Sequence, residues 1–157
     1  MGDYNISRMR PVGEVDEAVI GNVTGFLNTL LANEYALFTK TLNYHWNITG
    51  PRFHSIHKFL EGHYRDLLEV MDDIAERVRV LGEVPLGTVG EMKTAMVINE
   101  KKARNMSSSE MLEDLFTSNL QIQTTIKEAV AKDGFFKTDP GTEDFVTGIL
   151  QKHEMMS

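Results

Sequence analysis

The stretch that decides the fold is residues 30–88, LLANEYALFTKTLNYHWNITGPRFHSIHKFLEGHYRDLLEVMDDIAERVRVLGEVPLGT. In its first part, apolar residues recur at the three- and four-residue spacing of a helix. The break NITGP contains Gly50 and Pro51, which end a helix, and a second helical pattern then runs from about Phe53 to Leu81. The segment LGEVPLG closes this pattern with a glycine followed by a proline. We therefore expect two long helices joined by a short turn.

The helical pattern continues on both sides of this stretch. The first helix extends back to about Val15 and ends near Trp46. Further along the chain, SSSE has the form of a capping box, with Ser107 followed three residues later by Glu110. This box opens a third helix, which reaches about Asp133.

The last helix follows the segment TDPG. Asp139 is a suitable N-cap, Pro140 suits the first helical position, and the pattern continues to about His153. Between the second and third helices lies a long connection, in which residues 88–97 could form a short helix. The prediction is an all-α fold, a ferritin-like four-helix bundle with a short helix in the crossover between helices 2 and 3.

The composition limits the function. The 157 residues suit one globular domain, which we expect over residues 14–157, after an N-terminal tail over residues 1–13. The formal net charge of −7 argues against general nucleic-acid binding and is compatible with binding cations. The chain is too polar to span a membrane and no export signal follows Met1, so a cytoplasmic location is expected. With no cysteine, any metal must be held by histidines and carboxylates.

The second helix has two different faces. One is an apolar stripe that should face the core, formed by Ile56, Phe59, Leu60, Leu67, Val70, Ile74, Val78 and Leu81. The opposite face is a polar stripe formed by His57, Glu61, Asp72 and Glu76. The polar stripe consists of two pairs, each four residues apart, which is the spacing at which two side chains on a helix can reach one ion. Imidazole together with carboxylates suits iron, manganese or zinc better than calcium or magnesium.

Each pair by itself is also common on a solvated helix surface, so plain surface charge is the alternative interpretation. The remaining histidines are interpreted one by one. His63 falls on the apolar stripe and is expected to be a hydrogen-bonded core residue. His54 lies on the polar side and stays ambiguous, and His153, near the C-terminus, is expected to be uninformative. His45 shares the apolar line of the first helix, and alone it indicates a core histidine.

A complete metal site needs two copies of the chain. With a rise of about 1.5 Å per residue, Glu61 and Asp72 lie roughly 16 Å apart along one helix, too far to share an ion. His57 and Glu76 are centred on the same point as Glu61 and Asp72, between residues 66 and 67. An antiparallel pair of these helices about a two-fold axis at that point would oppose His57 to Glu76 and Glu61 to Asp72 of the second copy. Two identical sites would then form per dimer.

In these motifs, residues 30–88 resemble the Dps family, the DNA-binding proteins from starved cells that are also called miniferritins. The resemblance lies in His-Trp-Asn, then Gly and Phe, then His with an acid four residues later, and finally Asp-x-x-x-Glu-Arg before Leu-Gly. It implies a dodecameric hollow shell of four-helix subunits. Such a shell oxidises Fe(II), preferentially with hydrogen peroxide, and stores the iron as ferric mineral. The resemblance thus implies a ferroxidase that protects against oxidative damage.

The resemblance also assigns roles by position. The implied iron ligands are contributed by two subunits, namely His45, His57 and Glu61 from one, and Asp72 and Glu76 from its neighbour. Trp46 matches the family's tryptophan beside the site, an auxiliary electron donor, although it could also simply pack under the helix end. Asp144 aligns with an acid that lines the iron-uptake pore on the three-fold axis of the shell.

The sequence departs from the family pattern in two ways. It has Glu61 where the family most often has aspartate, which leaves the occupancy of a second iron position open. The family's late tryptophan has no counterpart in the segment HEMMS. The Glu-x-x-His pair of ordinary di-iron bundles is absent, which disfavours a typical ferritin or bacterioferritin.

Two other functions stay open. Family members that bind DNA tightly usually carry a lysine-rich tail, whereas MGDYNISRMRP offers Arg8 and Arg10 against Asp3. Because phosphate neutralisation sets affinity, DNA binding is expected to be weak or absent, and nucleoid association would depend on it. The other alternative is a shell that binds zinc or manganese without turnover.

Overall fold

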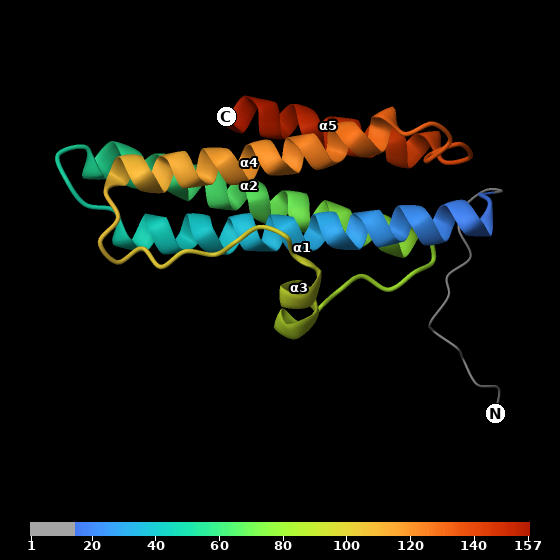
Figure 1. Cartoon of the computed structure of the whole chain (residues 1–157), viewed down its shortest axis with the longest axis horizontal. Helices are drawn as coiled ribbons and strands as arrows, with labels where there is room; N and C mark the ends of the chain where they lie inside the picture. The colour runs from blue at the N-terminus through green and yellow to red at the C-terminus, as the bar shows by residue number, and fades with distance from the viewer. Residues whose placement is uncertain (1–14) are drawn as a thin grey trace.

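The computed structural model describes residues 15–157, which form four long helices and one short one. The long helices are α1 (Glu17–Asn47), α2 (Phe53–Val80), α4 (Ser108–Ala131) and α5 (Pro140–Met156), and the short one is α3 (Val89–Ala95). Figure 1 shows the long helices side by side, with α3 outside the bundle next to α1, in the crossover that lets α2 and α4 run in the same direction. This confirms the predicted fold class. The tail expected over residues 1–13 lies outside the described residues.

The helix ends follow from local signals in the sequence. Ser107 and Glu110 form a reciprocal capping box at the start of α4. The Asp139 side chain caps α5, whose first residue is Pro140. Gly82 follows α2 with φ of 88°, in the left-handed region that glycine adopts without a steric penalty. The predicted bounds of the long helices are therefore close to the observed ones.

The core lies between the four long helices. Of the predicted apolar stripe on α2, six residues are buried, namely Leu60, Leu67, Val70, Ile74, Val78 and Leu81. Ile56 is partly buried, and Phe59 is 55% exposed, so the prediction for Phe59 was wrong. The reason is that α5 ends at Met156, part-way along the bundle, and leaves the beginning of α2 uncovered (Figure 1). No helix in residues 15–157 is long and apolar enough to cross a bilayer.

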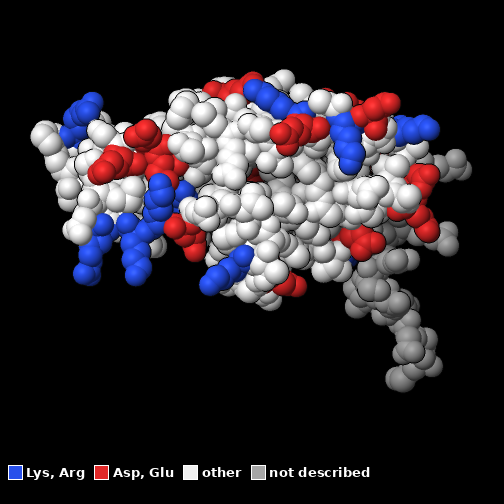
Figure 2. All heavy atoms as spheres, viewed as in Figure 1, with Lys and Arg blue, Asp and Glu red and all other residues white. Residues whose placement is uncertain are grey.

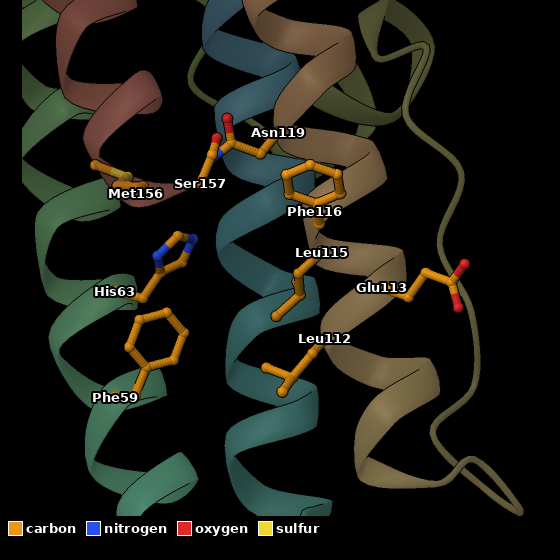
Figure 3. A pocket seen from close by; sticks show the side chains of 9 residues that line it. All are labelled: Phe59, His63, Leu112, Glu113, Leu115, Phe116, Asn119, Met156 and Ser157. Atoms are coloured by element: carbon orange, nitrogen blue, oxygen red, sulfur yellow. The ribbon is translucent and has the colours of Figure 1, made fainter.

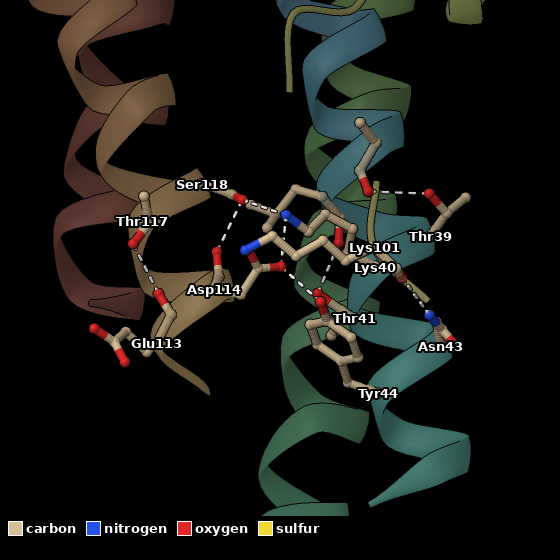
Figure 4. Close-up of polar contacts among 12 residues, drawn as sticks. Thr39, Lys40, Thr41, Asn43, Tyr44, Lys101, Glu113, Asp114, Thr117 and Ser118 are labelled. Atoms are coloured by element: carbon tan, nitrogen blue, oxygen red, sulfur yellow. Dashed lines mark hydrogen bonds and ion pairs between the residues drawn. The ribbon is translucent and has the colours of Figure 1, made fainter. Parts of the chain in front are cut away.

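A buried ion pair joins α1 to α4 and to the crossover (Figure 4). The carboxylate of Asp114 accepts hydrogen bonds from Lys40 and Lys101, each at 2.7 Å, and from the Tyr44 hydroxyl at 2.6 Å. Burial acts to raise the pKa of Asp114, but the hydrogen bonds from Lys101, Lys40 and Tyr44 outweigh it and hold the pKa below its usual range. Burial, together with the Asp114 carboxylate, raises the pKa of Tyr44 above its usual range. This cluster fixes the end of α1 that carries His45.

Candidate metal centre

His45 and His57 face each other where α1 ends and α2 begins. Their rings are stacked, with centroids 3.8 Å apart. The Nδ1 atom of His45 lies 3.0 Å from the backbone carbonyl oxygen of His57, and the Nδ1 atom of His57 lies 3.0 Å from that of His45. A carbonyl oxygen can only accept a hydrogen bond, so both Nδ1 atoms must donate. In the neutral imidazoles this leaves each Nε2 with a free electron pair, which is the atom that can bind a metal.

Two aromatic rings hold the imidazoles in place. Phe53 stacks on His57 with a centroid distance of 5.0 Å, and Tyr64 packs edge-on against His45 at 5.3 Å. His45 is buried and His57 partly buried. The turn between α1 and α2 therefore brings together two histidines that lie twelve residues apart in the sequence. The apolar pattern of α1 correctly indicated burial for His45.

Glu61 lies one turn further along α2, and both of its carboxylate oxygens are paired with cations. Oε1 is 2.6 Å from Nη2 of Arg65, and Oε2 is 2.9 Å from Nζ of Lys58. The hydrogen bond from Lys58 and the charge of Arg65 hold the pKa of Glu61 below its usual range. Glu61 is therefore ionised, as a metal ligand must be, but an incoming ion has to displace these cations. This pairing was not predicted from the sequence, although the spacings of three and four residues on one helix indicate it.

The second pair of the polar stripe, Asp72 and Glu76, is exposed further along α2. Within residues 15–157, no three or more His, Asp or Glu side chains come together in a group that could hold a metal ion. A single chain thus presents the two pairs of the polar stripe apart from each other. Their union with those of a second copy stays a prediction.

The other predicted site residues lie on the surface. Trp46 is 70% exposed, so it does not pack under the helix end within its own chain. His54 is exposed at the start of α2. Asp144 is exposed one turn into α5, a helix that begins at the end of the bundle opposite to the turn between α1 and α2 (Figure 1).

Three buried residues differ from what the sequence predicted. His153 is fully buried, and its Nε2 lies 2.7 Å from Oε1 of the fully buried Glu34. The expectation that His153 is uninformative was wrong, because α5 packs against the bundle to its last turn. Glu34 was missed, although it occupies the apolar line of α1 four residues after Leu30. His63 is buried as predicted, but its Nε2 has no hydrogen-bond partner, so the expected hydrogen bond is missing at this atom.

Comparisons with known proteins agree with this fold. The family model of the ferritin-like domain matches residues 25–156. The DNA protection during starvation protein 2 of Bacillus anthracis is 30% identical over 135 residues, which cover 83% of this chain and 90% of that protein. This chain belongs to the Dps family of the ferritin-like superfamily. An uncharacterized low temperature-induced protein of a Nostoc species is 37% identical over 143 residues, 91% of this chain and 79% of that protein. The structure of DpsC from Streptomyces coelicolor matches with a TM-score of 0.87 at 25% identity, covering 96% of this chain and 88% of that one.

Proposed function

We propose that this Dps-family protein is an iron-oxidising and iron-storing miniferritin of the cytoplasm. It oxidises Fe(II) with hydrogen peroxide or dioxygen at sites shared between subunits of a dodecameric homo-oligomer, and it stores ferric mineral inside the shell. The observation that carries the proposal is the arrangement of His45 and His57. Two adjacent imidazoles commit their Nδ1 atoms to backbone carbonyls and keep their Nε2 atoms for a metal.

The donor groups fit iron as the substrate. Two imidazoles and Glu61 from one subunit, with Asp72 and Glu76 of a second, give a mixed nitrogen and oxygen set of the kind that binds iron. Gly62 supports close approach of a second α2, because it is exposed and a Cβ at this position would meet nothing within its own chain. In the antiparallel register, Gly62 would lie opposite Met71 of the second copy.

The chemistry follows from the charge of the ligands. Carboxylate oxygens stabilise Fe(III) more than Fe(II), because the harder ion gains more from them, so oxidation at the site is favoured. Two Fe(II) ions supply two electrons to one peroxide, and two protons complete two water molecules. The peroxide O–O bond is thus cleaved without releasing a hydroxyl radical, which makes the reaction protective. Trp46, exposed directly after His45, is suited to take up stray oxidising equivalents.

The co-assembly of two damaged variants tests the shared site. His57→Ala and Asp72→Ala should each be slow, because every site in a homodimer has lost one ligand. Chains of both variants, mixed unfolded in equal amounts and refolded, should recover about a quarter of the wild-type rate, since half of the dimers are mixed and each mixed dimer has one intact site. His54→Ala, an exposed histidine on the same helix, should keep the wild-type rate.

Two results would contradict the proposal. If mass spectrometry shows mixed assemblies and the mixture is no faster than its parents, the ligands are grouped in another way. If Fe(II) added without oxygen and then treated with peroxide gives no ferric absorbance, the protein binds metal without turnover.

DNA binding is proposed to be weak or absent. Relatives carry names such as DNA protection during starvation protein, but the net charge here is −7. Figure 2 shows acidic and basic side chains interspersed over the visible face of the described residues. A supercoiled plasmid that stays bound at moderate salt in a mobility-shift assay would overturn this part of the proposal.

A further inference from the structure

Two cations, Lys58 and Arg65, lie on the same face of α2 as the polar stripe. At about 100° per residue, both fall within the arc that runs from His57 to Glu76. Nζ of Lys58 is 2.9 Å from Oε2 of Glu61, and Nη2 of Arg65 is 2.6 Å from Oε1. These two side chains therefore neutralise the one carboxylate that this half of the proposed shared site contributes.

This face of α2 is open to a second copy of the chain. Figure 3 shows Phe59 and His63 pointing from α2 into the pocket that α4 and the end of α5 border. The polar stripe lies on the other side of the helix, and the side chains of Lys58 and Arg65 are 65% and 66% exposed. Within residues 15–157, Glu61 is the only ion-pair partner of either cation, so no other ion pair holds them in place.

The other half of the polar stripe has carboxylates without cations. Asp72 and Glu76 form no ion pair with any residue in the described part of the chain. In the antiparallel register, these two carboxylates of the second copy would join Glu61. Three ionised carboxylates at one site repel one another unless cations are present. Lys58 and Arg65 lie at this site already, so they offset most of the negative charge while no metal is bound.

We propose that Lys58 and Arg65 are the resident counter-ions of the empty shared site, and that the need to displace them keeps out divalent ions that bind through oxygen alone. The inference rests on the proposed function, because it assumes that two copies share the site. An entering ion needs the carboxylate oxygens that the ammonium and guanidinium groups occupy, so it must displace both groups.

The displacement costs the same for every divalent ion, but the ions differ in what they gain. Mg²⁺ prefers oxygen ligands and gains little from imidazole, so only the carboxylates offset the loss of the two ion pairs. Fe(II) and Zn²⁺ also gain the Nε2 atoms of His45 and His57, whose Nδ1 atoms are committed to backbone carbonyls. The counter-ions therefore leave Mg²⁺ without net binding at millimolar concentration, while the site still binds Fe(II).

The test measures Zn²⁺ binding to the metal-free, assembled protein by titration calorimetry, with and without millimolar Mg²⁺. The double variant, Lys58→Gln with Arg65→Gln, should bind Zn²⁺ about tenfold more tightly than the wild type at low ionic strength, since each exposed ion pair accounts for a few-fold. The gain should shrink at high salt, because salt screens exposed ion pairs. Mg²⁺ should weaken Zn²⁺ binding to the double variant and leave binding to the wild type unchanged.

Two controls separate the effect of charge at this site from other effects. Lys58→Arg with Arg65→Lys keeps both cations and should bind Zn²⁺ like the wild type. Lys127→Gln with Lys152→Gln removes two other ion-paired cations of α4 and α5, with the same change in net charge, and should also bind like the wild type. Each single substitution, Lys58→Gln or Arg65→Gln, should give about a threefold gain, so one variant that fails to assemble does not prevent a decision.

The outcomes distinguish this inference from the proposed function. If the wild type binds Zn²⁺ at a site that needs His57 and Asp72, but the double variant binds no more tightly than the control that lacks Lys127 and Lys152, the counter-ion role is wrong and the shared site stands. If the wild type binds no Zn²⁺ at such a site, the shared site fails and the counter-ion role is overturned with it.

Discussion

At the scale of single residues, the carboxylate of Glu61 decides whether the polar stripe binds a metal or only cationic side chains. Glu61→Gln should slow Fe(II) oxidation and weaken Fe(II) binding by at least about tenfold, because the charged oxygen ligand is lost. Stability should change little, since Glu61 faces away from the core and its partners Lys58 and Arg65 are exposed. The measurement is stopped-flow absorbance after mixing with Fe(II) and peroxide, beside a thermal unfolding curve.

A matched control for this experiment is Glu69→Gln, another exposed glutamate of α2 outside the polar stripe. It removes the same charge and should leave the oxidation rate unchanged. If Glu61→Gln instead lowered the unfolding temperature and oxidised iron at the wild-type rate, Glu61 would be a structural residue.

A second prediction at this scale concerns how stability depends on pH through His63. Burial lowers the pKa of His63 to about 4. Between about pH 6.5 and pH 4, His63 is protonated in the unfolded chain, where its pKa is the ordinary value near 6.5, and neutral in the folded chain. The folded state therefore loses stability as the pH falls through this window, by about 3 kcal/mol per chain from this one group. His63→Gln, which cannot titrate, should lack this part of the pH dependence.

This prediction is checked by chemical unfolding of both proteins in chelator at several pH values between 4 and 7. The quantity of interest is the difference in unfolding free energy between the two, because other groups titrate in both. A difference that does not change with pH would mean that His63 is solvated in the assembled protein.

At the scale of the helices, most of the fold could be read from local sequence. The capping box of Ser107 and Glu110, the Pro140 start and the Gly82 end depend on neighbouring residues, so they could be predicted without knowing the tertiary contacts. Phe59 could not be placed in the same way, because its exposure depends on how far α5 extends along α2. The direction in which a side chain points is local, but what covers it is not.

The candidate site was likewise predictable where it depends on one helix, and not where it depends on how helices pack. The polar stripe follows from helix periodicity alone, whereas the contact of His45 with His57 needs the angle between two helices, and it entered only through the family resemblance. The Glu34–His153 pair needs two helices far apart in sequence to pack together. The available signal for such a buried pair was a charged residue among the apolar positions of a helix. Glu34 and Lys40 are two such residues on α1, and both are buried.

Asp114 gives a prediction for how the elements hold together, since it links α1, α4 and the crossover. Asp114→Asn should cost about 3–5 kcal/mol, because the buried Lys40 keeps its charge and loses its counter-charge. Lys101→Gln removes the other, exposed cation of Asp114 and should have only a small effect. Urea unfolding of the two variants at pH 7 compares them directly. Equal effects would mean that Lys40 reaches water in the assembled protein.

At the scale of the whole molecule, the proposed functions need a closed shell, and Asp144, which we propose lines a pore of that shell, is the sharpest probe of one. Asp144 lies one turn into α5, and α5 begins at the end of the bundle opposite to the turn between α1 and α2 (Figure 1), so we expect Asp144 to affect iron through the way subunits meet. Around a three-fold axis, Asp144→Asn removes three negative charges at once. It should slow iron uptake by about tenfold at low ionic strength, and by less at high salt, because a focused negative field raises the arrival rate of cations.

The uptake experiment needs native mass beside it, since the proposed pore requires a closed shell, and a dodecamer would have about twelve times the chain mass of 17.8 kDa. The variant should keep this mass and oxidise the iron that reaches the site. Asp133→Asn is the matched control, an exposed aspartate just beyond α4 that removes the same charge per chain. If Asp144→Asn takes up iron as fast as Asp133→Asn at low salt, Asp144 does not line the route of iron. If the native mass is that of a monomer, the shared site and the storage cavity are excluded together.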